Sequence, residues 1–183
     1  LMLALSIGHK TNVIKALLEA GADVNEVDEA GNTPLMSAVM RDYGLDVITA
    51  LLDAGADANA GSTEDSWSAA RGQTALMYAT ISARVDVMNA LILAGADVNA
   101  ADGNGETALT TAAMYSSVSG YVDAIRALIA AGADVNAKDN IDDSPYLYAG
   151  ARGFNQILRL TLNHGADLKS TNRYGGTALI PAC

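Results

Sequence analysis

The chain has 183 residues, half of them hydrophobic but only 5% aromatic, and a formal net charge of -10. This length and composition exclude a disordered chain and favour one folded domain whose core is built from small and aliphatic side chains. The negative charge repels phosphate groups, so nucleic acid is excluded as an expected partner. No apolar run reaches the roughly 18 residues of a spanning helix, and we expect no membrane insertion.

The chain has only one cysteine, Cys183. No internal disulfide and no cysteine-based metal site can therefore form. We expect a soluble protein, with the cytoplasm favoured over the periplasm or secretion. The first residue is Leu1, and a natural leader preceding it would not be visible in this sequence.

Two short patterns return along the whole chain. Gly-Ala-Asp begins at residues 21, 55, 95, 132 and 165, and a Thr/Ser-Pro/Ala-Leu/Tyr tripeptide begins at 33, 74, 107, 144 and 177. The step from the first pattern to the second is 12 residues in four of five cases, and the underlying period is 33. Self-similarity at such a period is typical of a solenoid.

Residues 1–26 form the first, partial copy. Apolar pairs at 13–14 and 17–18 lie one helical turn apart and predict a helix that packs on the next copy. Gly21 follows, where a helix end requires a left-handed residue. The polar stretch 25–32 then predicts a turn.

Residues 27–60 form the first complete copy. Thr33 caps a predicted helix through its hydroxyl, and Pro34 occupies the first helical position, where a missing N–H costs nothing. Its predicted buried face has apolar residues at i, i+3 and i+4: Leu35, Ala38 and Val39. A second helix across 47–52 ends before Gly55.

Residues 61–100 form the next copy, and the finger that leads from the Gly-Ala-Asp pattern at 55 to the tripeptide at 74 contains a seven-residue insertion. The insertion includes Trp67, the single tryptophan of the chain. An indole is frequent at binding hot spots, but it can equally fold back and pin its own loop. We favour packing onto the adjacent repeats, and presentation of Trp67 to a partner stays open.

The last copies span 101–137, 138–170 and, incompletely, 171–183. The first of these has four additional residues in its helix-helix turn. The second has Asp142 where other copies have a turn glycine and Tyr146 where they have leucine. It also has Gly150 inside a helix, which costs roughly 0.5 to 1 kcal/mol relative to alanine. We therefore expect this copy to be the least stable.

These motifs resemble the ankyrin repeat. The period of 33, Thr33-Pro34-Leu35 at a helix start and Gly95-Ala96-Asp97-Val98-Asn99 after a second helix are similar to that family over nearly the whole chain. The resemblance implies an all-α ankyrin-repeat solenoid of helix-turn-helix pairs with short β-hairpin fingers. In composition the repeats look more like bacterial than animal members. Both ends fall within a repeat and neither has a polar cap, so we expect further residues on both sides.

Candidate catalytic and metal-binding residues are sparse. The two histidines, His9 and His164, lie far apart in the repeat order, and we expect both to be structural. Residues 102–106 begin like an EF-hand loop but lack its glycine and its bidentate glutamate, so we interpret them as a turn of the repeat. We expect no enzyme activity, no cofactor and no metal.

The remaining candidate is a binding surface. In the resembled family, partners bind the concave side, formed by exposed residues of the first helices and by the finger tips. Met, Tyr, Ile and Arg there are typical of interface cores, although such residues can also only cover neighbouring helices. The predicted protein-binding residues are Met40, Arg41, Trp67, Arg71, Gln73, Ile81, Ser82, Asn104, Glu106, Met114, Tyr115, Ile141, Arg152, Arg173 and Tyr174.

The resemblance implies a protein partner and a non-catalytic scaffold. The net charge suggests that this partner has a basic patch. Two alternatives stay open: the array is the regulatory or targeting domain of a larger enzyme, or it is a dedicated inhibitor or effector of a cellular enzyme.

Overall fold

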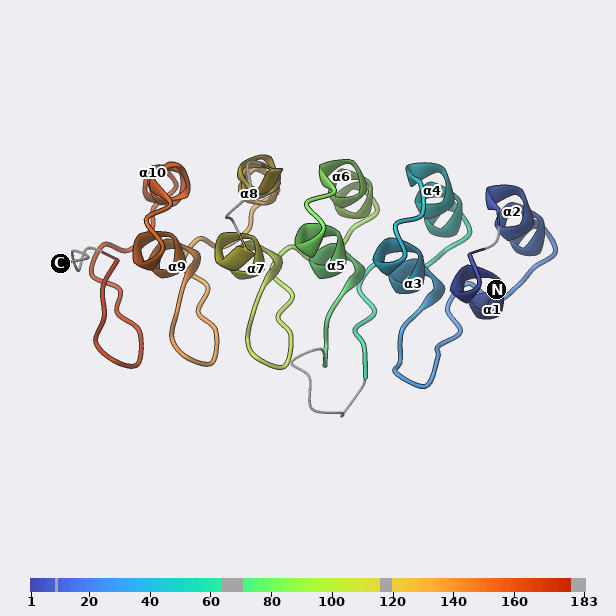
Figure 1. Ribbon diagram of the computed structural model, residues 1–183, viewed down its shortest axis with the longest axis horizontal. Helices are drawn as coiled ribbons and strands as arrows, with labels where there is room; N and C mark the ends of the chain where they lie inside the picture. The colour runs from blue at the N-terminus through green and yellow to red at the C-terminus, as the bar shows by residue number, and fades with distance from the viewer. Residues whose placement is uncertain (9, 64–70, 116–119, 179–183) are drawn as a thin grey trace.

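The computed structural model describes residues 1–8, 10–63, 71–115 and 120–178, which form a row of paired helices with loops projecting from one side (Figure 1). The first helices of the pairs are α1 Met2–Ser6, α3 Pro34–Met40, α5 Ala75–Ile81, α7 Ala108–Tyr115 and α9 Pro145–Ala151. The second helices are α2 Thr11–Glu19, α4 Leu45–Asp53, α6 Val85–Leu93, α8 Gly120–Ala130 and α10 Asn155–Asn163. The prediction of an all-α solenoid is confirmed.

The first helices begin where the sequence predicts. The hydroxyls of Thr33, Thr74 and Ser144 accept hydrogen bonds from backbone N–H groups three residues later, at 3.3, 3.4 and 3.3 Å. These caps satisfy N–H groups that have no partner within the helix. Pro34 and Pro145 occupy the first helical positions, as expected.

The second helices also end at the predicted residues. The glycine of each Gly-Ala-Asp pattern has a φ between 80° and 92°, a conformation that side chains with a Cβ rarely adopt. The finger turns use the same conformation at Gly31, Gly105 and Gly175. Asp142 takes it at a φ of 62°, so the aspartate occupies the glycine position without changing the turn.

The core lies between the two helix rows and is made of small and aliphatic side chains. Leu35, Leu76 and Leu109 are fully buried at equivalent positions of successive first helices. Tyr146 replaces leucine in α9 and is also fully buried, and its hydroxyl has no hydrogen-bond partner among the described residues. An unpaired buried hydroxyl costs about 1–3 kcal/mol, and the lower stability of this copy stays a prediction.

An asparagine ladder links the turns that follow the second helices. The side chain of Asn59 donates to the Gly95 carbonyl at 3.0 Å and accepts from the Asp97 N–H at 2.7 Å. Asn25, Asn99 and Asn136 make the same pair of bonds to the following copy. The ladder therefore fixes the spacing of four successive repeat steps.

The fingers form a second ladder, but they are not β-hairpins in the full sense. Their described residues contain no β-strand and two isolated antiparallel bridges, Gly61 with Thr74 and Ala101 with Thr107. The expected strand pairing is missing because the carboxylates of Asp28, Asp102 and Asp139 each accept two backbone N–H groups within their own finger. These turns use the donors that a longer strand ladder would need.

The expectation that Gly150 lowers the stability of α9 relative to alanine is wrong. A Cβ built on it would lie 2.5 Å from the Cα and 2.6 Å from the carbonyl oxygen of Ala178. Alanine at this position would therefore overlap the following copy, although it is the better helix former. Packing, and not helix propensity, accounts for the glycine.

Candidate protein-binding surface

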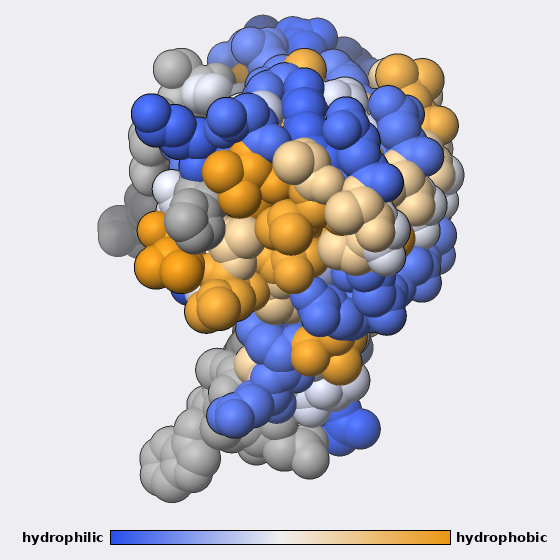
Figure 2. Space-filling model, turned by 90° about the vertical axis from the view of Figure 1, so that its right-hand side faces the viewer, coloured by the Kyte–Doolittle hydropathy of each residue, from blue (hydrophilic) through white to orange (hydrophobic). Residues whose placement is uncertain are grey.

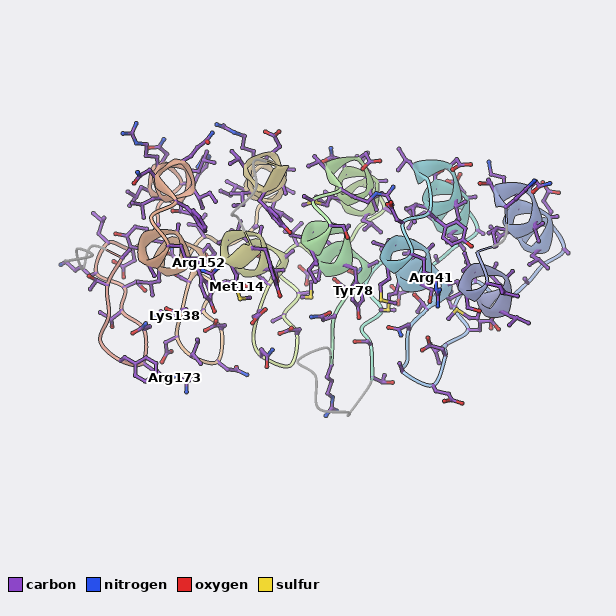
Figure 3. All side chains as sticks on the ribbon, viewed as in Figure 1. Arg41, Tyr78, Met114, Lys138, Arg152 and Arg173 are labelled. Atoms are coloured by element: carbon purple, nitrogen blue, oxygen red, sulfur yellow. The ribbon has the colours of Figure 1, made fainter. Side chains whose placement is uncertain are left out.

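We define the concave face as the exposed and half-buried residues at the ends of the first helices and on the fingers. The ends of four first helices, α3, α5, α7 and α9, supply Met40 and Arg41, Ile81 and Ser82, Met114 and Tyr115, and Ala151 and Arg152, of which Arg41, Ser82 and Arg152 are C-caps. Figure 3 places Arg41, Tyr78, Met114 and Arg152 in one row where the first helices meet the fingers. The residues form a row because the first helices of successive copies lie side by side in the same orientation (Figure 1).

Every described member of the predicted set is open to solvent to some degree. Met40 is 43% exposed and Tyr115 is 49% exposed, whereas Ile81 and Met114 are half-buried. On the fingers, Arg71, Ile141, Arg173 and Tyr174 are exposed and Gln73, Asn104 and Glu106 are half-buried. Trp67 lies outside the described residues, so both interpretations of it stay predictions.

The insertion joins the finger at two bonded residues. The N–H of Thr63 donates to the Ala30 carbonyl at 3.1 Å, and the carbonyl of Arg71 accepts from the Gly103 N–H at 2.6 Å. The same bonds link the later fingers, from Asn140 to Asn104 and from Arg173 to Ile141. The seven inserted residues, 64–70, thus lie between two points of the finger ladder that are occupied as in the other copies.

Carboxylates of the third and fourth fingers lie close together. Burial and the neighbouring charges of Asp102 and Asp139 raise the pKa of Glu106 above its ordinary value of 4.5. Burial also raises the pKa of Asp143, against the opposing effects of Asn172, Arg173 and Lys138. In both carboxyl groups burial is the main cause of the raised pKa, and the charge of Asp139 adds to it.

A tyrosine from the helix row contacts this finger group. The Tyr148 hydroxyl donates to the Asp139 carboxylate at 2.6 Å, and burial together with that carboxylate raises the pKa of the tyrosine. The contact joins α9 to its own finger and holds the tyrosine ring in the angle between them. Tyr148 is therefore a half-buried aromatic member of the concave face.

Arg41 lines a hollow of about 450 Å³ between the helix-helix turns of the first two copies. The hollow is bordered by Leu5, Ser6, Ile7, Gly8, Arg41, Asp42, Tyr43 and Gly44. Arg84 holds its wall, since its guanidinium donates to the Tyr43 carbonyl at 2.7 Å and pairs with the Asp42 carboxylate at 3.0 Å. Asp42 is thus engaged by Arg84.

Three concave-face residues were missed by sequence reasoning: Tyr78, Lys138 and Tyr148. Both tyrosines lie four residues after a helix cap, at the position of Ser37 in α3. Comparing this position across the copies would have identified them. Lys138 lies on a finger and donates to the Thr171 carbonyl of the next one at 2.8 Å, a contact between copies that its local sequence does not indicate.

A separate apolar surface covers the end of the array formed by α1 and α2 (Figure 2). Leu3 and Ile7 are 73% and 65% exposed there, beside Val13. This end is not part of the predicted set, but it can associate with other apolar surfaces at high concentration. Binding experiments with the array therefore need a check of its oligomeric state.

Within the described residues, neither His164 nor the acidic side chains form an evident chemical site. His164 ends α10 and its Nδ1 donates to the Leu160 carbonyl at 2.8 Å, which is a structural contact; His9 lies outside the described residues. No group of three metal-ligating side chains is present in the described part of the chain. Among the same residues, no helix is both long and apolar enough to span a membrane.

Comparison with known proteins agrees with the repeat geometry. A family model described as "Ankyrin repeats (3 copies)" matches residues 1–62 and 58–139. The chain is 49% identical over 41 residues to "E3 ubiquitin-protein ligase XBAT33" of Arabidopsis thaliana, and 69% identical over 29 residues to "Protein fem-1 homolog CG6966" of Drosophila melanogaster. These segments are 22% and 16% of this chain, and 8% and 4% of the two relatives.

Proposed function

The chain belongs to the ankyrin-repeat family, and from this premise we propose that it is a non-catalytic scaffold that binds a protein partner through its concave face. Ankyrin repeats are in general protein-binding modules. The partner is set by the variable surface residues and not by the fold.

The observation that carries the proposal is the row of Met, Ile, Tyr and Arg side chains along the first helices. These residue types are enriched in the buried centres of protein interfaces. The helices behind them are held by caps, by the core and by two ladders, so the row is preorganised before a partner arrives. The finger residues then extend the surface on one side.

Affinity capture from native lysate tests this proposal. We expect the Met114→Ala, Tyr115→Ala double variant to lose specific partners that the unmodified array retains, because it removes apolar contacts at the middle of the row. Leu93→Ala is the matched control, since Leu93 is 88% exposed at the end of the second helix α6. Equal capture by all three proteins, with unchanged thermal unfolding, would contradict the concave-face assignment.

We further propose that the partner has a basic patch that is attracted by the negative charge of the array at long range. Twenty-one acidic residues against 11 lysines and arginines support this part of the proposal. The association rate should then fall as ionic strength rises. An association rate that is independent of ionic strength would contradict the proposed basic patch.

A second possibility is that the array targets or regulates a larger enzyme. The relative named as an E3 ubiquitin-protein ligase supports this, because the matched segment is 8% of that protein. The complete reading frame around this chain tests this possibility, because it would show whether an enzyme domain is encoded in the same protein. An inhibitor or effector role is tested by adding the purified array to a captured enzyme and measuring its turnover.

A further inference from the structure

Arg41 and Arg152 occupy equivalent places at the ends of two first helices, α3 and α9, and α5 and α7 lie between them. Arg41 is the C-cap of α3 and Arg152 is the C-cap of α9, and both side chains are exposed (Figure 3). Neither guanidinium has a hydrogen bond or an ion pair with any residue that the structure describes. Two arginine heads at matching positions are therefore available on the concave face.

The surface between these arginines is mainly apolar. The intervening copies supply Ile81 with the polar Ser82 at the end of α5, and Met114 with Tyr115 at the end of α7. Met40 extends the apolar surface beside Arg41. The surface from α3 to α9 thus has an apolar centre with a cation on each side of it.

The nearby acids of the chain are already engaged. Asp42, next to Arg41, pairs with Arg84 at 3.0 Å. On the fingers below Arg152, Asp139 accepts from Tyr148 and from two backbone N–H groups, and Asp143 interacts with Asn172, Lys138 and Arg173. The carboxylates that would complement Arg41 and Arg152 have to come from another molecule.

From this arrangement we propose that the concave face binds a partner segment with an apolar centre and a carboxylate side chain on each side of it. Arg41 binds one carboxylate beside the hollow that it lines, and Arg152 binds the other. Arginine suits this role because its planar head forms two parallel hydrogen bonds with one carboxylate. The inference rests on the proposed function and specifies the chemistry of the segment that is bound.

The spacing of the arginines limits this segment. They are three repeat steps apart, which is roughly 24–30 Å if neighbouring helices are 8–10 Å apart. An extended segment at about 3.3 Å per residue needs about eight residues between its acids. A helical one at about 1.5 Å per residue needs about 18.

Exposed arginines without a partner also occur elsewhere on the described surface, and they supply a control. Arg126 and Arg159 lie on the second helices α8 and α10, where no equivalent apolar row separates them. These arginines share the lack of an ion pair with any described residue, whereas the placement on either side of Ile81, Met114 and Tyr115 is particular to Arg41 and Arg152. Replacing either pair of arginines by glutamate changes the net charge by the same amount.

Selection from a phage-displayed library of random 24-residue segments tests the inference. We expect enriched segments to have Asp or Glu on both sides of an apolar centre. A synthetic consensus peptide should bind Arg41→Glu, Arg152→Glu arrays with a Kd raised about tenfold or more per arginine, and its lysine-flanked counterpart should prefer this variant. The Arg126→Glu, Arg159→Glu array should bind like the unmodified protein.

The outcomes separate this inference from the proposed function. Enriched segments that lack flanking acids, but are lost with the Met114→Ala, Tyr115→Ala variant, would overturn the inference and leave the concave face as the binding surface. Equal weakening by both arginine double variants would also overturn it, as an effect of net charge only. Failure to enrich any segment, or binding that no concave-face variant changes, would overturn both.

Discussion

Gly150 illustrates how contacts between copies decide the effect of one residue. The glycine lies inside α9, where alanine would be preferred by about 1 kcal/mol in an isolated helix. The backbone of Ala178 occupies the space that a Cβ would need. The close approach of the next copy therefore outweighs helix propensity.

Replacing Gly150 by alanine tests this packing. We expect Gly150→Ala to lower the free energy of unfolding by about 1–3 kcal/mol, because the methyl group overlaps Ala178. Gly120→Ala is the control, since a Cβ there meets its nearest neighbour, the Cβ of Ala83, at 3.4 Å. Urea unfolding of both variants is the measurement, and a Gly150→Ala protein as stable as the Gly120→Ala protein would contradict the packing argument.

Glu106 makes stability depend on pH. Its pKa is raised in the folded protein, so the carboxyl group ionises less readily in the folded than in the unfolded chain. The free energy of unfolding therefore decreases as the pH rises from the ordinary pKa of 4.5 through the raised pKa of the folded state. Glu106→Gln should therefore stabilise the array at pH 7, by less than about 1 kcal/mol because the side chain is partly open to solvent. The gain should vanish below pH 4.5, where the carboxyl is protonated in both states.

Thermal unfolding between pH 4 and 8 measures this effect. Glu29→Gln is the matched control, because Glu29 is exposed on the first finger. A Glu106→Gln gain that is the same at pH 4 and pH 7 would show that the amide, and not the lost charge, causes it.

At the scale of elements, the two ladders fix the spacing of the copies. The asparagine ladder joins the turns after the second helices, and the finger ladder joins the fingers through backbone bonds. Local rules of the sequence predict the helices, their caps and their glycine ends. They do not predict either ladder, because each bond joins residues about one repeat apart.

Asn59→Ala tests the first ladder. The change removes a bond to the Gly95 carbonyl and one from the Asp97 N–H, and we expect a loss of about 1–2 kcal/mol of unfolding free energy. Asn89→Ala, at an exposed site of α6, is the control. Equal stability of the two variants in urea unfolding would show that the ladder contributes nothing.

Deleting residues 64–70 tests the two interpretations of Trp67. The deletion joins Thr63 to Arg71, which keeps the two residues that make the ladder bonds and restores the length of the other fingers. Packing of Trp67 onto the adjacent repeats, which we favour, predicts a lower unfolding midpoint in urea, because the shorter loop itself changes the closure cost only slightly. An unchanged midpoint together with a loss of binding would contradict this and indicate that Trp67 is presented to a partner.

At the scale of the whole molecule, the repeat converts a short sequence pattern into a long surface. The period and the caps were sufficient to predict the helix pairs and their order along the chain. Tyr148 and Lys138 were not predicted, since their places depend on contacts with a finger carboxylate and with the next finger. The engagement of Asp42 by Arg84, which leaves Arg41 without that partner, also depends on a contact between copies.

Hydrogen–deuterium exchange of the array with and without a selected peptide tests the central claim most directly. We expect added protection at the ends of the first helices, over residues 37–41, 78–82, 111–115 and 148–152, with the second helices unchanged. This pattern follows if the partner lies along the concave face. Protection confined to the second helices, or to the apolar end at α1 and α2, would contradict the account.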